Sequence, residues 1–213
     1  MDQLLEEQQQ SKVLIRMEKK LQEIKQQVVE CTKCELSKTR NNSVAGKGNF
    51  KSDVIFVGEA PGKNEDLKGE PFIGIAGKKL SMALESAGIT RDEVYITNIV
   101  KCRPPNNRVP TTNERETCKD YLKKEIEIIK PKIICILGNT AFGSLLDGKE
   151  ITKYRGKIVR KDNQLYFLTV HPAATIYNQK LIDVLKNDIE KLFKLIKELN
   201  DNKEIQIDIE YTS

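Results

Sequence analysis

The sequence predicts an α/β fold in which helices cover both faces of a central, mainly parallel four-stranded sheet. Two observations support this. The chain contains four short runs of apolar, β-branched residues, and such near-continuous runs are typical of strands buried on both faces. Helical patterns separate the runs, and strands that alternate with helices form a parallel sheet between two helical layers. At 213 residues the chain is long enough for one well-buried domain of this kind.

The first element is an amphipathic helix expected over residues 1–30. This stretch is charged, rich in Gln and free of Gly and Pro. Its apolar residues recur at spacings of three and four, which marks one face of a helix. We expect this face to pack on the domain that follows, with a short coiled-coil seam as the alternative. The residues of the face are Leu14, Met17, Leu21, Ile24 and Val28.

The remaining elements form one domain, expected over residues 31–200. The expected strands are Asp53–Gly58, Val94–Thr97, Lys132–Leu137 and Gln164–Val170. The expected helices lie at about 76–88, 112–129, 139–147 and 179–199. The second of these helices opens with a capping box formed by Thr111 and Glu114. Residues 201–213 are a polar tail, in which the alternating Ile205, Ile207 and Ile209 could add an edge strand.

The composition limits the classes of function. The net charge is +5, from 36 basic and 31 acidic residues, a mild excess that is compatible with a nucleic-acid partner. No stretch approaches the roughly 20 apolar residues of a membrane span. The N-terminus lacks the pattern of a signal peptide, so we expect no membrane association and a cytoplasmic location.

Four cysteines have the spacing of a metal site. Cys31 and Cys34 form a C-x-x-C pair, and Cys102 and Cys118 follow on either side of a basic, Pro-rich loop. The cytosol keeps thiols reduced, so ligation is a better interpretation of these residues than disulfides. Four thiolates suit either zinc or an iron–sulfur cluster. The fifth, Cys135, lies within an apolar strand and is expected to be a buried hydrophobic residue.

Chemically distinctive residues follow three of the four expected strands. Glu59 comes directly after the first strand, with Phe72 beyond it; Asn98 ends the second, and His171 follows the fourth. In open α/β sheets, sites form at the carboxyl ends of the strands. The predicted topology therefore brings these four side chains to one cleft.

Three motifs around these residues resemble those of family 4 uracil-DNA glycosylases. The first is Gly58–Gly77, with the sequence GEAPGKNEDLKGEPFIGIAG, and the second is Thr97–Arg108, with TNIVKCRPPNNR. The third is His171-Pro172-Ala173. The resemblance runs from Cys31 to about Lys180 with uninterrupted spacing. It implies a monomeric three-layer α/β/α sandwich with a [4Fe-4S] cluster on Cys31, Cys34, Cys102 and Cys118. The implied activity is removal of uracil from single- or double-stranded DNA at the nucleoid, which leaves an abasic site.

The resemblance also implies roles for individual residues. Phe72 would stack on a flipped-out uracil, and the Asn98 carboxamide would pair with its edge. His171 would donate a hydrogen bond to uracil O2, while Glu59 would stabilise the sugar cation or orient water. Ala60 stands where related families carry an Asp and cannot act as a base. Glu65, held by Asn107, is our candidate for the wall that excludes the thymine methyl.

The expected DNA contacts surround these motifs. Lys101, Arg103, Arg108 and Arg155 would contact phosphates, which position DNA without reading its sequence. Ile176 would wedge into the base stack. Tyr177 stands where the family commonly has an Arg, which leaves strand gripping by this loop open. The inserted basic loop of a related branch that captures its product covalently is absent, which favours ordinary turnover. A sliding clamp that docks on either terminal extension is a further candidate partner.

Two alternatives explain part of the pattern. A non-catalytic iron–sulfur or zinc nucleic-acid-binding module would use the cysteines and the basic loop, but it gives no role to Glu59, Asn98 and His171. An electron-transfer protein would account for the cluster alone.

Overall fold

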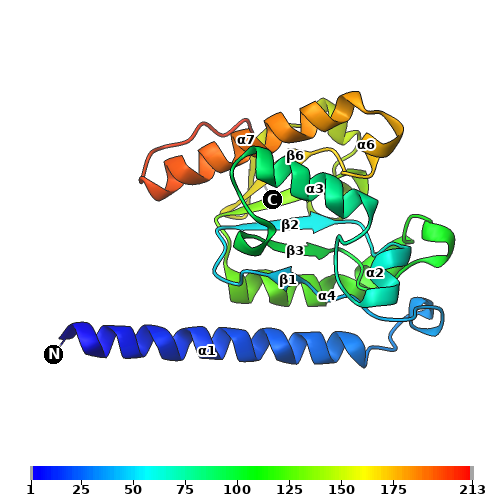
Figure 1. Ribbon diagram of the computed structural model, residues 1–213, viewed down its shortest axis with the longest axis horizontal. Helices are drawn as coiled ribbons and strands as arrows, with labels where there is room; N and C mark the ends of the chain where they lie inside the picture. Colours follow the sequence, from blue (N-terminus) through cyan, green and yellow to red (C-terminus); the bar gives the residue numbers. More distant parts are fainter. Residues whose placement is uncertain (1, 212–213) are drawn as a thin grey trace.

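The computed structural model describes residues 2–211, with side chains from Glu7 onward. A seven-stranded sheet forms its middle layer, in the order β1-β3-β2-β4-β6-β5-β7 (Figure 1). The strands are β1 (Lys47–Gly48), β2 (Val54–Gly58), β3 (Tyr95–Asn98), β4 (Ile133–Leu137), β5 (Ile158–Lys161), β6 (Gln164–Thr169) and β7 (Ile209–Tyr211). The four expected strands are β2, β3, β4 and β6, which pair in parallel as predicted.

The expected number of strands was wrong, because three short strands extend the parallel centre. β1 pairs antiparallel with β3 over two residues. β5 pairs antiparallel with β6 through a tight turn at Asp162 and Asn163, both at positive φ (49° and 62°), as a two-residue hairpin turn requires. β7 pairs with β5 and includes Ile209 of the alternating tail.

Seven helices connect or cover these strands. They are α1 (Asp2–Val29), α2 (Lys63–Lys68), α3 (Ile75–Ser86), α4 (Thr112–Ile129), α5 (Asn139–Leu146), α6 (Ala174–Tyr177) and α7 (Lys180–Asn200) among the described residues. Short 3₁₀ turns lie at Glu35–Lys38, Arg91–Glu93, Pro105–Asn107 and Ile151–Lys153. At the start of α4 the expected capping box is present, since Thr111 and Glu114 each accept the other's main-chain N–H.

The alternation of side chains along each strand divides the core between the two faces of the sheet. In β2, Val54 and Phe56 pack with α3 and α7, while Ile55 and Val57 pack with α4 and α5. Figure 1 shows α3 and α7 on one side of the sheet and α4 on the other. The predicted three-layer α/β/α architecture is therefore confirmed.

α1 packs against α4 on the outer side of the domain (Figure 1). Of its apolar face, Ile24 and Val28 are buried, whereas the earlier members are only half-buried. The last turn leads directly to Cys31. No helix in the described part of the chain is long and apolar enough to cross a membrane.

Because β2, β3, β4 and β6 are parallel, their carboxyl ends lie at one edge of the sheet. Gly58 pairs with Asn98 at this edge, and Leu137 pairs with Thr169. The segments that leave this edge contain the residues singled out in the sequence.

Candidate functional site at the carboxyl edge

A cavity of about 550 Å³ opens at this edge of the sheet. It brings together eight of the sequence-predicted site residues although they come from distant parts of the chain. These residues are Glu59, Ala60, Glu65, Phe72, Asn98, Asn107, His171 and Ile176. The cleft expected from the strand ends is thus a single cavity.

Glu59 enters the cavity from the end of β2 and is half-buried. The Thr140 hydroxyl, from the first turn of α5, donates a hydrogen bond to Glu59 Oε2. This contact fixes the direction of the carboxylate. The other oxygen, Oε1, accepts no hydrogen bond from a protein group within residues 2–211.

Phe72 is held in a strained turn between α2 and α3. It is buried, and its φ is 52°, a left-handed conformation that is unfavourable for a bulky residue. The Arg91 guanidinium donates to the carbonyls of Phe72 (2.8 Å) and Pro71. A Cβ at Gly77 would lie 1.7 Å from the Phe72 carbonyl oxygen, so only glycine allows this turn to pack on α3. The Phe72 ring lies 5.7 Å from the His171 ring, centroid to centroid.

Glu65 is buried and is held by the main chain. Its Oε1 accepts hydrogen bonds from the N–H groups of Ile73 (3.0 Å) and Gly74 (2.7 Å). Asn107 Oδ1 accepts from Arg103 Nε at 2.7 Å, and the contact by which Asn107 would hold Glu65 stays a prediction. Both side chains still line the cavity, and Glu65 also fixes the loop that follows Phe72.

Asn98 presents an unused acceptor to the cavity. The residue is 1% exposed, and its Oδ1 has no hydrogen-bond partner among the described residues. Leaving a buried acceptor unpaired costs about 1–3 kcal/mol, so such an atom suggests a ligand. A Cβ on Gly58 would lie 2.6 Å from this oxygen and 2.5 Å from Phe72 Cζ. The first glycine of the motif therefore makes room for both side chains.

His171 is neutral and has a defined tautomer. Burial lowers its pKa to about 4, so the ring is uncharged near pH 7. Its Nδ1 accepts a hydrogen bond from the Ala173 N–H at 3.1 Å, which leaves the proton on Nε2 as the donor. Gly138, at φ +88°, lies where a Cβ would be 2.8 Å from His171 Cβ. The absence of a side chain at Gly138, at the end of β4, thus leaves room for His171.

The residues expected to contact DNA have four different surroundings. The assignment of Lys101 was wrong: its side chain is 1% exposed and forms an ion pair with Glu125, so it cannot reach a phosphate. Arg103 bonds to Asn107, Arg108 to Glu114 and Arg155 to Asp188. Side-chain exposure remains at 43% for Arg108 and 35% for Arg155, and none of the three arginines lines the cavity.

An exposed apolar pair lies at the cavity, on α6. Ile176 is 41% exposed and Tyr177 is 92% exposed, and both line the cavity. Because α6 follows His171-Pro172 directly, the same loop places the histidine inside and the pair at the surface.

The four cysteines of the expected ligand set gather where α1 ends against α4. Cys102 and Cys118 are buried, and Cys31 and Cys34 pack against the same cluster as free thiols. Arg40 donates to Cys102 Sγ at 3.0 Å, and the Lys101 N–H donates to Cys118 Sγ at 3.2 Å. Burial raises the pKa of the Cys118 thiol to about 12. In the described part of the chain, no group of three or more His, Cys, Asp or Glu residues is arranged to hold a metal ion.

Two supporting residues were not assigned from the sequence. Thr140 follows β4 at the same edge as the predicted residues, so its position was a usable signal. Arg91 lies in a 3₁₀ turn before β3, and nothing in the sequence around it indicated its contact with the Phe72 turn.

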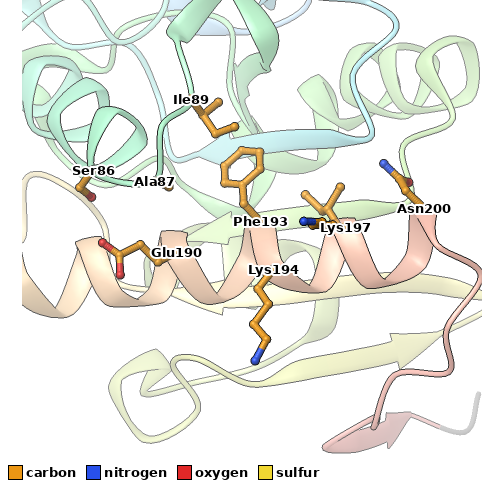
Figure 2. Close-up of a pocket in the computed structure, with 9 residues that line it drawn as sticks. Ser86, Ala87, Ile89, Glu190, Phe193, Lys194, Lys197 and Asn200 are labelled. Carbon is orange, nitrogen blue, oxygen red and sulfur yellow. The ribbon is translucent and has the colours of Figure 1, made fainter.

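A second cavity, of about 610 Å³, lies between the end of α3 and α7 (Figure 2). Its lining residues include Ile89, Phe193 and Lys197, and none of the sequence-predicted site residues lines it. This second cavity is therefore separate from the site at the carboxyl edge.

Comparison with known proteins agrees with the motifs. Residues 45–198 match the family model described as the uracil DNA glycosylase superfamily. The chain is 44% identical over 184 residues to the type-4 uracil-DNA glycosylase of Archaeoglobus fulgidus, covering 82% of this chain and 92% of that protein. It is 45% identical over 185 residues to the type-4 uracil-DNA glycosylase of Sulfurisphaera tokodaii, covering 82% and 84%. For the protein of that name from Saccharolobus solfataricus, identity is 43% over 195 residues, covering 87% and 88%.

Proposed function

The chain belongs to the uracil DNA glycosylase superfamily, and from this membership we propose that it is a monofunctional uracil-DNA glycosylase. It binds uracil that has been flipped out of DNA, hydrolyses the N-glycosidic bond and leaves an abasic site. The high identity to type-4 enzymes over most of the chain supports this activity.

The observation that supports the substrate best is the unpaired Asn98 Oδ1. Uracil carries a proton on N3 that this oxygen accepts, while the Asn98 amide donates to O4. Cytosine has no proton on N3 and carries an amino group at position 4, so it would leave both partners unsatisfied. A site built to hydrogen-bond its substrate rejects the mismatched analogue strongly.

Thymine differs from uracil only by a methyl group, which an apolar gap rejects poorly. We assign the required wall to Glu65 and Asn107, which both line the cavity. Glu65 is suited to this role because two main-chain N–H groups fix its carboxylate. On the opposite side, Phe72 stacks on the base.

His171 stabilises the leaving base. As the bond between C1′ and uracil N1 breaks, the electron pair moves onto uracil, and negative charge develops at O2. The neutral ring donates its Nε2 proton as a hydrogen bond to that oxygen, because Nδ1 is already engaged as an acceptor. Preorganised donors of this kind often contribute more to catalysis than any other single effect.

Glu59 acts on the sugar side. Thr140 fixes one carboxylate oxygen, and the other orients a water molecule, whose oxygen bonds to C1′ and whose proton passes to the carboxylate. The negative charge also stabilises the cationic sugar. Ala60, beside it, leaves room for the water but supplies no base.

DNA is gripped outside the cavity. Ile176 wedges into the space that the flipped base leaves, and the exposed Tyr177 ring offers a face on which a neighbouring base can stack. Arg103, Arg108 and Arg155 contact phosphates with the donors that their carboxylate and amide partners leave available. We propose that the enzyme works as a monomer on single- and double-stranded DNA, in the cytoplasm at the nucleoid.

We further propose that Cys31, Cys34, Cys102 and Cys118 hold a [4Fe-4S] cluster. Their surroundings fit such a group, because Arg40 and the Lys101 N–H already donate to two of the sulfurs, and donors to sulfur stabilise cluster thiolates. Each thiolate of a cluster binds a different iron, so the sulfurs need not converge on one ion as zinc ligands do. When bound, the cluster ties α1 to the segment after Asn98. We propose residues 31–200 as the glycosylase domain, on which α1 packs and to whose sheet β7 adds the outermost strand.

The test is direct. Purified protein is incubated with oligonucleotides that contain one uracil, either single-stranded or in a U·G pair, and abasic sites are then cleaved with alkali. We expect strand cuts at uracil in both substrates. Matched oligonucleotides with thymine or cytosine at the same position should stay intact. No cut at uracil would contradict the glycosylase activity and favour the non-catalytic binding module.

A further inference from the structure

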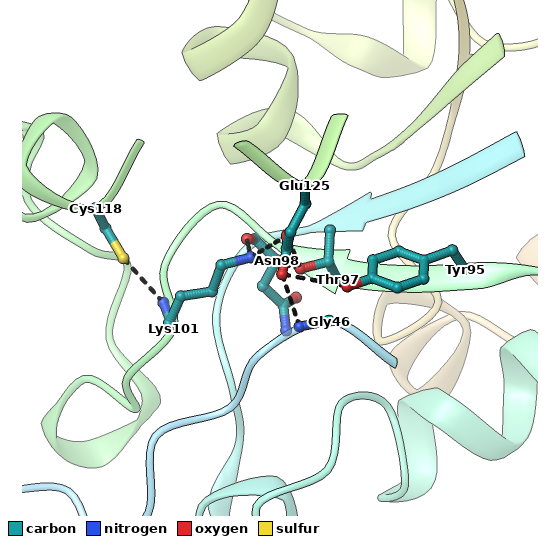
Figure 3. A network of polar contacts seen from close by, with 7 residues as sticks. All are labelled: Gly46, Tyr95, Thr97, Asn98, Lys101, Cys118 and Glu125. Atoms are coloured by element: carbon teal, nitrogen blue, oxygen red, sulfur yellow. Dashed lines mark hydrogen bonds and ion pairs between the residues drawn. The ribbon is translucent and has the colours of Figure 1, made fainter. Parts of the chain in front are cut away.

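A buried ion pair lies beside Asn98 (Figure 3). Lys101 Nζ stands 2.6 Å from Glu125 Oε2, and each side chain is 1% exposed. Lys101 follows the end of β3, whereas Glu125 comes from the middle of α4. Burying two charges is unfavourable unless further hydrogen bonds satisfy their remaining donors and acceptors. The other hydrogen bonds of this pair therefore show whether it is stable in its buried position.

The hydrogen bonds of the pair are complete. Lys101 Nζ also donates to Thr97 Oγ1 (2.5 Å) and to the Asn98 carbonyl (3.0 Å), which uses all three ammonium protons. Glu125 Oε2 accepts from the Thr97 hydroxyl at 2.9 Å, and its Oε1 accepts from the Gly46 N–H at 2.9 Å. The ammonium group is thus a fixed donor to the main chain of Asn98.

The main chain of Lys101 is held as well. Its N–H donates to Cys118 Sγ at 3.2 Å, and its carbonyl accepts from the Val44 N–H at 2.7 Å. The next residue is Cys102. One residue therefore connects the cysteine set to Asn98 by two routes, through the chain and through its side chain.

We propose that Lys101 and Glu125 are positioning residues. They hold Asn98 in the orientation that reads uracil, and they couple the position of Asn98 to that of the cysteine set. This inference rests on the proposed function. The direction of the Asn98 carboxamide depends on its backbone, which pairs with Gly58 of β2 and whose carbonyl also accepts a hydrogen bond from the Lys101 ammonium group. A misplacement of about 1 Å in an active site can cost about 10²-fold in rate, so loss of the anchor should lower excision without affecting DNA binding.

Two variants test the proposal. Lys101→Met combined with Glu125→Gln removes both charges together, so no uncompensated charge stays buried. Thr97→Val keeps the shape of the side chain but removes its hydroxyl from the network. Tyr95→Phe is the matched control, because it removes only a 3.5 Å contact at the far side of Glu125.

The readouts are kcat and KM on a uracil oligonucleotide, the melting temperature and the visible absorbance of the purified protein. We expect kcat to fall about tenfold to hundredfold in the double variant and less in Thr97→Val. KM should stay near the wild-type value, since phosphate contacts elsewhere set DNA binding. Melting temperature and absorbance should stay close to wild type, and Tyr95→Phe should match wild type throughout.

Wild-type kcat in both the double variant and Thr97→Val would overturn the proposal. It would also be overturned if kcat fell only together with melting temperature or absorbance, because the pair would then serve the fold alone. Wild-type protein that fails to excise uracil would contradict the proposed function itself, which the first assay separates from this inference.

Discussion

The Asn98 side of the cavity depends on side chains, whereas the His171 side depends on the main chain. Asn98 is anchored by the buried pair of Lys101 and Glu125, next to the cysteines. His171 is oriented by the Ala173 N–H and fits against Gly138. Charged networks are sensitive to changes in any one member, while a backbone contact depends only on the local chain path. The two halves of the cavity should therefore fail for different reasons.

The largest effects are expected from the two side chains themselves. Asn98→Asp and His171→Ala should each lower single-turnover uracil excision about 10²- to 10³-fold, the usual cost of losing a donor to a developing oxyanion or the base-reading amide. DNA binding, measured by fluorescence anisotropy, should persist because the phosphate contacts lie elsewhere. Near-wild-type rates in both variants would contradict both assignments.

Replacing Cys102 should disturb the Asn98 side of the cavity, although Cys102 does not line the cavity. Cys102→Ala removes one of the proposed cluster ligands and the sulfur to which Arg40 donates. We expect lower visible absorbance, a lower melting temperature and slower excision together, since the segment from Asn98 to Cys102 loses its anchor. Cys135→Ala is the matched control, because Cys135 is a buried thiol in β4 outside this set. If excision stayed at the wild-type rate while the visible absorbance was lost, the Asn98 side of the cavity would not depend on the cysteine set, and this prediction would be contradicted.

The sequence predicted the cavity because a simple rule applies to it. Glu59, Asn98 and His171 each follow a strand of the parallel centre, and the carboxyl ends of such strands share one edge. Phe72 was assigned through the motif, while its strained turn and the Arg91 clamp depend on packing between separate segments. Patterns of hydrophobic periodicity do not contain that information.

Lys101 illustrates why the remaining errors arose. In the sequence it belongs to a basic, Pro-rich stretch and resembles a phosphate ligand. Its burial depends on Glu125, 24 positions away on α4, and only the tertiary structure brings the two together. Strands β1 and β5 were missed for a similar reason: β1 has two residues, and β5 exists through its hairpin with β6.

A glycine substitution breaks the His171 side without touching the cysteines. Gly138→Ala places a Cβ 2.8 Å from His171 Cβ at a φ of +88°, so the ring must shift. We expect excision to fall about tenfold, with unchanged visible absorbance. Left-handed strain alone costs about 1–3 kcal/mol of stability. Gly88→Ala is the control, since Gly88 has φ +73° with nothing within 4 Å; it should lose similar stability but keep full activity.

The smallest effect concerns pH, and it reports on the His171 side alone. His171 is the only histidine in the chain, so the NMR signal of its Cε1–H proton can be assigned without ambiguity. Burial lowers its pKa to about 4, against about 6.5 for an ordinary histidine. Between pH 7.5 and about 5.5 the signal should therefore stay at the position of the neutral ring. A midpoint near 6.5 would contradict the neutral donor on which the assignment of His171 depends.

The same shift predicts how stability changes with acidity. Because the folded-state pKa of His171 lies below the unfolded value, the unfolded chain binds the extra proton first as the pH falls. The neutral ring costs nothing above about pH 6.5, and stability should decline progressively as the pH drops from there toward about 4. His171→Gln removes this titrating group, so the free energy of unfolding measured in urea should fall less steeply between pH 7 and 5 in that variant. If the free energy of unfolding fell equally steeply with pH in both proteins, groups other than His171 would cause the pH dependence, and the lowered pKa of His171 would be contradicted.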